Sequence, residues 1–334
     1  MMPPAMPPAM PPVPPYRPPL GLAGGHRQSV LPTLFRRVDG VAYRRERIEL
    51  DDGDFLDLDW HDATAPADGP RRVAVVSHGL EGSSDRAYVR GMARALGARG
   101  WDVCAWNFRG CSGEPNRLMR ATHSGATEDL AAVVARVLDS GDASVGLVGF
   151  SLGGNLTLRW LGEQGAGVDP RVVGAATFAV PIDLASSAAV MDLPSRAIYM
   201  RRFLRTLAAK VESRAGRFED APDPTPFHRM RSFREFDTAF TAPVHGFESA
   251  EDYWAQASAR PVLGEIRVPT LLANAQDDPF LGPACFPHDI ASESAWLTLV
   301  TPEHGGHVGF IEHGGTYWSE RVAGLWLDAA VTGR

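Results

Sequence analysis

Residues 144–160, SVGLVGFSLGGNLTLRW, contain the pattern that decides the fold. An apolar run ends at Gly149, Ser151 stands between glycines two residues away on either side, and a helical pattern begins directly afterwards. Residues 149–153 match G-x-S-x-G, in which a sharp turn from strand to helix holds a serine in a strained conformation. Ser151 is then either a nucleophile or a small residue that fills a tight corner. The strand before it and the helix after it favour the nucleophile.

A nucleophilic Ser151 requires two partners further along the chain. A serine hydroxyl attacks a carbonyl only when a base takes its proton, and the base needs an orienting carboxylate. The stretch NAQDDPF places Asp277 and Asp278 after one predicted strand, and HGGHVGF places His304 and His307 after the next. If the strands are parallel, both loops lie at the same sheet edge as Ser151.

The sequence leaves the choice of carboxylate open among three residues. We favour Asp278 over Asp277, because hydrolase acid loops usually place the acid three residues after a small residue, here Ala275. Asp277 is then a turn residue that caps its own backbone. Asp183, after the preceding predicted strand, is a less common position for the acid.

The histidine loop also offers alternatives. We favour His307 over His304, because the neighbouring glycines allow its imidazole to swing over the serine turn. Glu303, Glu312 and His313 crowd the same loop, but two glycines interrupt any helical metal-binding spacing. We therefore expect no metal here.

Acyl chemistry also needs hydrogen-bond donors for the oxyanion that forms in the transition state. The strand-end motif SHGLEGS provides the backbone N–H of Leu80, and the N–H of Leu152 follows the serine directly. We expect these two groups to form an oxyanion hole. His78 is interpreted as a structural histidine, Arg109 as a residue that pins its loop by pairing with a carboxylate, and Cys111 as a packed thiol.

Strand-like and helix-like patterns alternate from about residue 40, which predicts an α/β protein with a mostly parallel central sheet flanked by helices. Residues 44–60 add a predicted hairpin with an Asp-Asp-Gly-Asp turn. The alternation breaks in an aromatic, Arg-rich region that we interpret as a cap or lid over the strand ends. We therefore expect a disordered Pro-rich tail (1–20), two parts of the core (21–181 and 261–334) and a cap insertion (182–260).

Composition excludes several classes of function. The 334 residues carry a net charge of −7, so no basic field indicates a nucleic-acid partner. Lys210 is the only lysine, which removes most lysine chemistry. Three cysteines without a signal peptide indicate a reducing cytoplasm, and no apolar run is long enough for a membrane span. We expect no cofactor, and at most peripheral membrane contact through the arginines of YMRRFLRTLAAK.

Seven motifs in order resemble the YheT-like branch of the α/β-hydrolases: SHGLEGSS, NFRGCSGEPNR, HSGATEDL, GFSLGGN, FDTAFTAPVHGFESAEDYW, NAQDDPF and HGGHVGF. The resemblance runs from roughly Tyr16 to the C-terminus. It implies an α/β-hydrolase fold, a triad that falls on Ser151, Asp278 and His307, and esterase or lipase-type activity on acyl esters. Some eukaryotic members of this branch act on phospholipids. Tyr253-Trp254 departs from the two tyrosines that the resemblance leads us to expect.

Together these patterns predict a serine hydrolase that cleaves carboxylic acyl esters of small molecules or lipids through an acyl-enzyme. Two alternatives stay open at this point. An acyltransferase would use the same acyl-enzyme with an alcohol or thiol as acceptor, and a non-catalytic protein would keep the fold for ligand binding. The oligomeric state is not predictable from the sequence.

Overall fold

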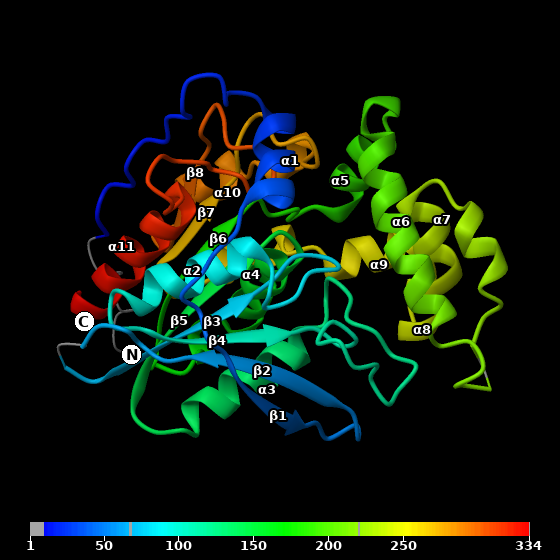
Figure 1. The fold of residues 1–334 in the computed structure, drawn as a ribbon, viewed down its shortest axis with the longest axis horizontal. Helices are drawn as coiled ribbons and strands as arrows, with labels where there is room; N and C mark the ends of the chain where they lie inside the picture. The colour runs from blue at the N-terminus through cyan, green and yellow to red at the C-terminus, as the bar shows by residue number, and fades with distance from the viewer. Residues whose placement is uncertain (1–9, 67–68, 220, 334) are drawn as a thin grey trace.

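The computed structural model describes residues 10–66, 69–219 and 221–333. Its centre is an eight-stranded sheet in the order β1-β2-β4-β3-β5-β6-β7-β8 (Figure 1). The strands are β1 (Arg44–Glu49), β2 (Phe55–His61), β3 (Arg71–Ser77), β4 (Asp102–Asn107), β5 (Ala143–Phe150), β6 (Val172–Phe178), β7 (Thr270–Ala273) and β8 (Leu297–Val300).

The sheet is parallel from β4 to β8, and only β2 pairs antiparallel, with β1 and with β4. The predicted hairpin is therefore confirmed, with Arg44 opposite Trp60 and Glu49 opposite Phe55. Gly53 allows its tight turn with a φ of 83°. The central strands are buried on both faces, which explains why they read as continuous apolar runs rather than alternating ones. The predicted α/β architecture is confirmed.

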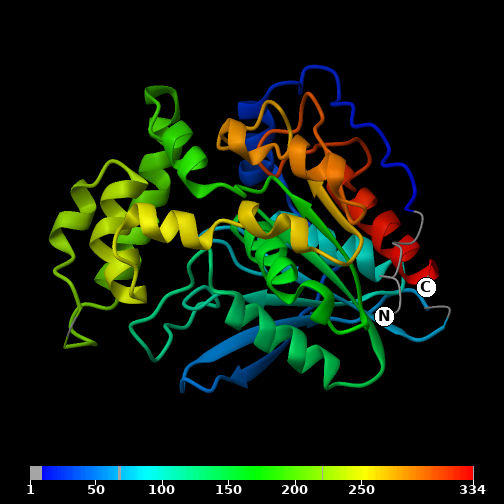
Figure 2. The ribbon, with the colours of Figure 1, turned by 180° about the vertical axis from the view of Figure 1, so that it is seen from behind.

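Helices cover both faces of the sheet. Helices α2 and α11 cover one face, and α3 and α4 cover the other (Figures 1 and 2). Their apolar side chains belong to the two core clusters on these faces. In α2, Val89, Met92, Ala93 and Leu96 are buried, the spacing of a helix with one apolar face. The core helices are α1 (Gly25–Phe35), α2 (Ala87–Gly97), α3 (Thr127–Leu138), α4 (Leu152–Gln164), η1 (Gly165–Gly167), η6 (Pro283–Cys285), α10 (His288–Glu293) and α11 (Trp318–Thr332).

A second group of helices lies between β6 and β7, beyond the ends of the strands (Figures 1 and 2). It occupies the segment 182–260 and has its own apolar cluster, formed by aliphatic residues of α6 and phenylalanines of η3, α7 and η4. We call this segment the cap. Its elements, with the turn that leads back to β7, are α5 (Leu184–Met191), η2 (Pro194–Arg196), α6 (Ala197–Glu212), η3 (Thr225–Arg229), α7 (Phe233–Phe236), η4 (Asp237–Thr241, a π-helix), α8 (Ala242–His245), α9 (Ala250–Ala257) and η5 (Arg260–Glu265).

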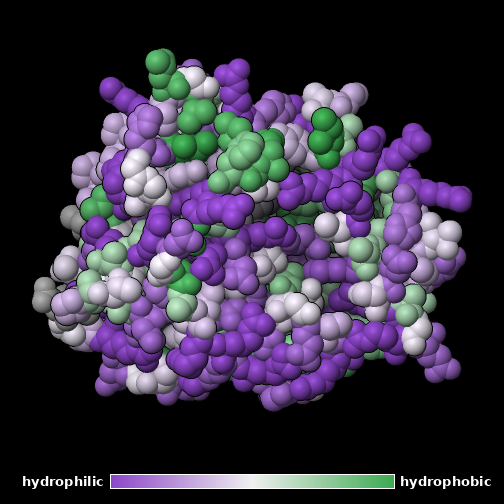
Figure 3. Space-filling view, viewed as in Figure 1, coloured by the Kyte–Doolittle hydropathy of each residue, from purple (hydrophilic) through white to green (hydrophobic). Residues whose placement is uncertain are grey.

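Helix α6 is amphipathic, as its sequence predicts. Met200, Leu204 and Ala208 are buried at four-residue spacing, whereas Arg201 and Arg205 are exposed. Apolar residues also show on the outer surface around α1 and the beginning of α6 (Figure 3). A membrane-spanning helix is not found in the described part of the chain, since none of its helices pairs the needed length with the needed hydrophobicity.

The sequence predicts a disordered Pro-rich tail over residues 1–20, but residues 10–20 differ from this expectation. This stretch is extended but packs on the core. The Tyr16 hydroxyl donates to the Ile311 carbonyl at 2.9 Å, and the Trp318 indole donates to the Pro14 carbonyl at 2.9 Å. Proline lacks an N–H but keeps its carbonyl, so an extended Pro-rich segment can still accept hydrogen bonds from the core. The other predicted tail residues, 1–9, lie outside the described residues.

Candidate active site

Ser151 lies on a sharp turn between β5 and α4. Its backbone has φ 53° and ψ −120°, a left-handed conformation that is strained for a residue with a side chain. The positions two residues before and two residues after Ser151 have room only for glycine, because a side chain there would collide with neighbouring backbone. A methyl group on Gly149 would lie 2.6 Å from the Gly153 carbonyl oxygen, and one on Gly153 would lie 2.4 Å from that of Ser77. The local sequence therefore holds the serine hydroxyl out from the end of the strand.

Three side chains from three strand-end loops form one chain of hydrogen bonds. Ser151 follows β5, Asp278 follows β7 and His307 follows β8. The Nε2 atom of His307 lies 2.9 Å from Ser151 Oγ, and its Nδ1 atom lies 2.8 Å from Asp278 Oδ2. A carboxylate that accepts from Nδ1–H leaves Nε2 free to accept the serine proton. This geometry can make Ser151 a nucleophile.

The other carboxylate candidates have different partners. The Asp278 side chain is fully buried beside His307. Asp277 turns away and lies 3.1 Å from Nδ1 of His304. Asp183 accepts from the N–H of Ser186 and caps α5. Only the side chain of Asp278, among these three, lies against the imidazole that reaches the serine.

The imidazole of His307 is held by contacts that sequence reasoning missed. Its backbone N–H donates to Ser29 Oγ at 2.8 Å, and its ring lies 4.3 Å from the ring of Phe280. Ser29 belongs to α1, a helix to which the sequence assigned no role and which carries no motif that could have revealed one. Gly305 and Gly306 have φ values of 150° and 55°, so the loop needs residues without side chains there.

The loop after β3 approaches Ser151 closely. A methyl group on Gly79 would lie 3.2 Å from Ser151 Cβ. The Gly79 N–H donates to the Tyr88 hydroxyl at 2.9 Å, and its carbonyl accepts from the Gly82 N–H at 2.9 Å. Tyr88 and the tight turn thus fix the backbone around Leu80.

Leu80 and Leu152 both line the cavity that holds Ser151. Within the described residues, no acceptor takes the backbone N–H of either one. Leu152 begins α4, and the first N–H groups of a helix have no partner inside it and favour negative charge. Both donors are therefore free for an anion near Ser151.

His78 has a structural place, as its sequence context indicates. Its Nδ1 donates to the Gly79 carbonyl at 2.7 Å, and its Nε2 accepts from the Phe108 N–H at 3.2 Å. Burial lowers the pKa of His78 to about 3, so the ring is neutral near pH 7. The neutral ring ties the loop after β3 to the loop after β4.

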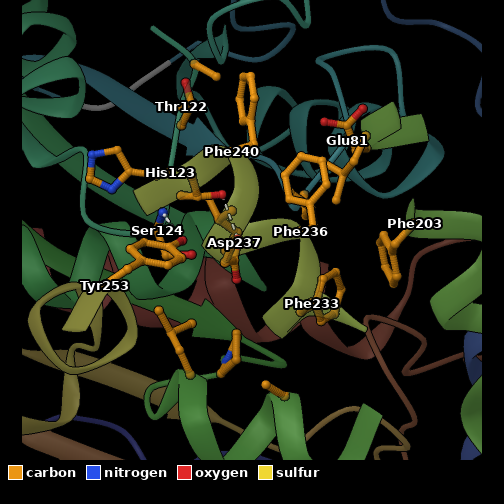
Figure 4. A pocket seen from close by; sticks show the side chains of 18 of the residues that line it. Glu81, Thr122, His123, Ser124, Phe203, Phe233, Phe236, Asp237, Phe240 and Tyr253 are labelled. Atoms are coloured by element: carbon orange, nitrogen blue, oxygen red, sulfur yellow. Dashed lines mark hydrogen bonds between the residues drawn. The ribbon is translucent and has the colours of Figure 1, made fainter. Parts of the chain in front are cut away.

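A cavity of about 1240 Å³, part of it open to solvent, extends from Ser151 and His307 into the cap. Phe233, Phe236 and Phe240 project into it (Figure 4). Aromatic and aliphatic side chains dominate its lining, which suits an apolar group of a ligand. The sequence predicted a cap at this edge but not which of its side chains face the cavity.

The departure at Tyr253-Trp254 has a structural role in the cap. The Trp254 indole donates to the carboxylate of Asp237 at 2.8 Å, and the Thr241 hydroxyl donates to it at 2.6 Å. The Tyr253 hydroxyl accepts from the Ser124 N–H at 3.0 Å. Burial raises the pKa of Asp237 to about 6. The Trp254 contact ties the π-helical turn η4 to α9, and the Tyr253 contact ties α9 to the loop before α3.

Comparisons with known proteins agree with this architecture. A family model described as the alpha/beta hydrolase fold matches residues 75–314. The Escherichia coli protein YheT is 38% identical over 318 residues, which cover 93% of this chain and 90% of YheT. Human phospholipase ABHD3 is 31% identical, and the match covers 86% of this chain and 71% of the phospholipase.

A solved structure shows the same fold at low identity. The esterase Pf2001 of Pyrococcus furiosus superposes with a TM-score of 0.56 at 18% identity, covering 87% of this chain and 97% of the esterase. The family model spans most of the region from β3 to the histidine loop, and the match to YheT spans nearly the whole chain. The chain therefore belongs to the α/β-hydrolase family, in its YheT-like branch.

Proposed function

We propose that this protein is a serine hydrolase that cleaves carboxylic acyl esters through an acyl-enzyme. The observation that carries the proposal is the unbroken chain of hydrogen bonds from Asp278 through His307 to Ser151 at the mouth of an apolar cavity. The names of two relatives, human phospholipase ABHD3 and a monoacylglycerol lipase of Saccharomyces cerevisiae, also support ester chemistry.

The first half of the reaction forms the acyl-enzyme. His307 Nε2 takes the proton of Ser151 Oγ while this oxygen bonds to the ester carbonyl carbon. The carbonyl oxygen becomes an oxyanion, and the N–H groups of Leu80 and Leu152 donate to it. The C–O bond to the alcohol then breaks, and His307 gives its proton to the departing alcohol oxygen.

The second half returns the enzyme to its starting state. Water loses a proton to His307 and attacks the acyl carbon, and the proton returns to Ser151 Oγ as the acid leaves. Asp278 keeps the imidazole in the required tautomer and stabilises the imidazolium formed twice per cycle. Its complete burial strengthens this interaction, because little water screens the pair.

The cap supplies the acyl site in this proposal. Phe233, Phe236 and Phe240 stand in the cavity that opens at Ser151, so an acyl chain bound to the serine can lie against them. Burial of each methylene group contributes about 0.8 kcal/mol, so the length of the cavity should set the preferred chain length.

The test is hydrolysis of p-nitrophenyl esters from acetate to palmitate, beside a Ser151→Ala variant. We expect turnover with an optimum chain length, and loss of turnover in the variant. An added alcohol acceptor distinguishes hydrolysis from acyl transfer, because a transferase forms the new ester. Wild-type turnover that survives in Ser151→Ala at full rate would contradict the proposal.

A further inference from the structure

Two buried arginines line the cavity near Ser151, and their surroundings differ. Arg109 is 3% exposed and donates to the carboxylates of Asp129, Asp54 and Asp52. Burial acts to lower the pKa of Arg109, but the hydrogen bonds with Asp129 and Asp52 outweigh it and hold the pKa above its ordinary value. Arg109 thus pins its loop, as its sequence context predicts.

Arg214, two residues after the end of α6, is 5% exposed, and no described carboxylate forms a comparable ion pair with it. Its Nε donates to the Met119 carbonyl at 3.2 Å and its Nη1 to the Lys210 carbonyl at 2.9 Å. Among the described residues, no carboxylate lies within ion-pair distance of Arg214, and its Nη2 has no acceptor. A buried charge without a counter-charge is costly, so such a group usually has a partner.

The free Nη2 faces a second, smaller cavity. A methyl group on Gly110 would lie 3.8 Å from Arg214 Nη2, and Gly110 lines this second cavity together with Asn116 and Arg217. Lys210 and Arg214 line both cavities, so they lie between the two. An extended molecule in the main cavity can reach the guanidinium from there.

The charge at this junction is positive. Lys210 Nζ lies 2.8 Å from the carboxylate of Glu81, so these two groups neutralise each other. Burial raises the pKa of the neighbouring Cys111 thiol, which keeps it neutral. Arg217 donates only to the Asn116 carbonyl in the described part of the chain. Glu114 also lines the second cavity but is paired with Arg47. Among the described residues, neither the buried Arg214 nor the exposed Arg217 has a carboxylate within ion-pair distance.

We infer that Arg214, with Arg217 behind it, binds an anionic group on the same substrate whose ester carbonyl lies at Ser151. This inference rests on the proposed function and adds the class of substrate. The substrate is an acyl ester that also carries a phosphate or carboxylate, because a guanidinium donates two parallel hydrogen bonds to either group. In this inference the apolar lining binds the acyl chain of the substrate, and the free N–H donors of Arg214 bind its anionic group.

Matched pairs of substrates test this inference. One pair is decanoylglycerol and decanoylglycerol phosphate, and the other is butyl decanoate and its analogue with a carboxylate at the end of the butyl group. Release of decanoate gives kcat/KM for each. We expect the wild-type protein to prefer the anionic member of at least one pair by about tenfold or more, the size of a charge-assisted hydrogen bond. The pair that shows the preference distinguishes phosphate from carboxylate.

Three variants locate the effect. Arg214→Gln should lower kcat/KM for the anionic member far more than for the neutral member and so abolish the preference, because it removes a contact made only to the anion. Arg205→Gln removes an exposed charge from α6, the helix that precedes Arg214, and should keep the preference. Arg214→Lys keeps the positive charge but loses the paired donors of the guanidinium, so it should keep part of the preference for the anionic member.

Several results would overturn the inference while leaving the proposed function intact. One is equal kcat/KM for both members of both pairs in the wild-type protein, a comparison that needs no folded variant. Another is an equal loss for anionic and neutral members in Arg214→Gln, which would show a structural role. Absence of wild-type activity on all four esters would instead contradict the proposed function.

Discussion

The loops at the sheet edge and the helices of the cap surround one cavity but hold their side chains in different ways. At the edge, Ser151, Asp278 and His307 are fixed by short polar contacts and by backbone turns that only small neighbours permit. In the cap, aromatic rings pack in a separate apolar cluster. Polar geometry is intolerant of small shifts, whereas apolar packing tolerates exchange of similar volumes. We therefore expect the edge to determine rate and the cap to determine substrate preference.

The largest expected effect on activity comes from substituting Asp278, compared with its neighbour Asp277 in the same strand-end loop. Asp278→Asn should lower kcat/KM by about 10⁴-fold, or about 5 kcal/mol of transition-state stabilisation, because the amide cannot hold the productive tautomer of His307. Asp277→Asn is the matched comparison: the side chain lies at His304 and accepts from the Gly306 N–H, and an amide oxygen can still accept that bond, so the loss should be far smaller. Ester hydrolysis by the purified variants measures kcat/KM of each. Equal losses in the two variants would contradict a specific role for Asp278.

A second substitution tests the backbone of the edge. Gly153→Ala would bring a methyl group within 2.4 Å of the carbonyl oxygens of Ser77 and His78. Backbone cannot give way as a side chain can, so we expect about 3 kcal/mol of lost stability or more, with lost activity. Urea unfolding measures the change, and Gly167→Ala, where a methyl group meets nothing within 4 Å, is the control. A fully stable Gly153→Ala would show that the turn is not tightly packed.

The cap should respond to pH through Asp237. Burial raises its folded-state pKa to about 6 from a usual value of 3.8, so the folded protein binds the extra proton between these values. Stability from this group is present at low pH and is lost as pH rises from about 4 to about 6, by up to about 3 kcal/mol.

Asp237→Asn removes this titration. The free energy of unfolding of the variant, relative to wild type, should therefore rise between pH 4 and pH 7. Urea unfolding at several pH values measures it. A constant difference between the two proteins across this range would show that Asp237 titrates normally.

The smallest expected effect concerns substrate preference. Phe233→Ala should shorten the preferred acyl chain and lower kcat/KM for long-chain esters by about tenfold, while acetate esters keep their rate. The p-nitrophenyl ester series measures this. An equal loss at all chain lengths would show that the cap supports the edge rather than the acyl group.

The contrast between edge and cap also explains what was predictable from the sequence. G-x-S-x-G, NAQDDPF and HGGHVGF are short patterns that follow strands, and parallel strands bring their ends to one edge. The sequence favours Asp278 over Asp277 by loop position alone, and the structure adds that the two adjacent side chains point in different directions, to His307 and His304. The alternating patterns predict a mostly parallel sheet, whereas the order of its strands comes from the structure.

Other features had no local pattern. Ser29 contacts His307 only because α1 folds back over the histidine loop, a contact across 278 residues. The packing of residues 10–20 depends in part on a backbone carbonyl, which every residue has, so no sequence pattern indicates it. The isolation of Arg214 is a matter of what surrounds it in space, since its sequence context resembles that of the exposed arginines of α6.

The most direct test of the account is covalent labelling with a fluorophosphonate, with the modified residue identified by mass spectrometry. A fluorophosphonate bonds to a serine oxygen only where a base activates it. We predict stoichiometric labelling of Ser151 in the wild-type protein, a strongly reduced rate in His307→Ala, and no label in Ser151→Ala. A folded wild-type protein that stays unlabelled at Ser151, or labels as fast without His307, would contradict the claim that this serine is an activated nucleophile.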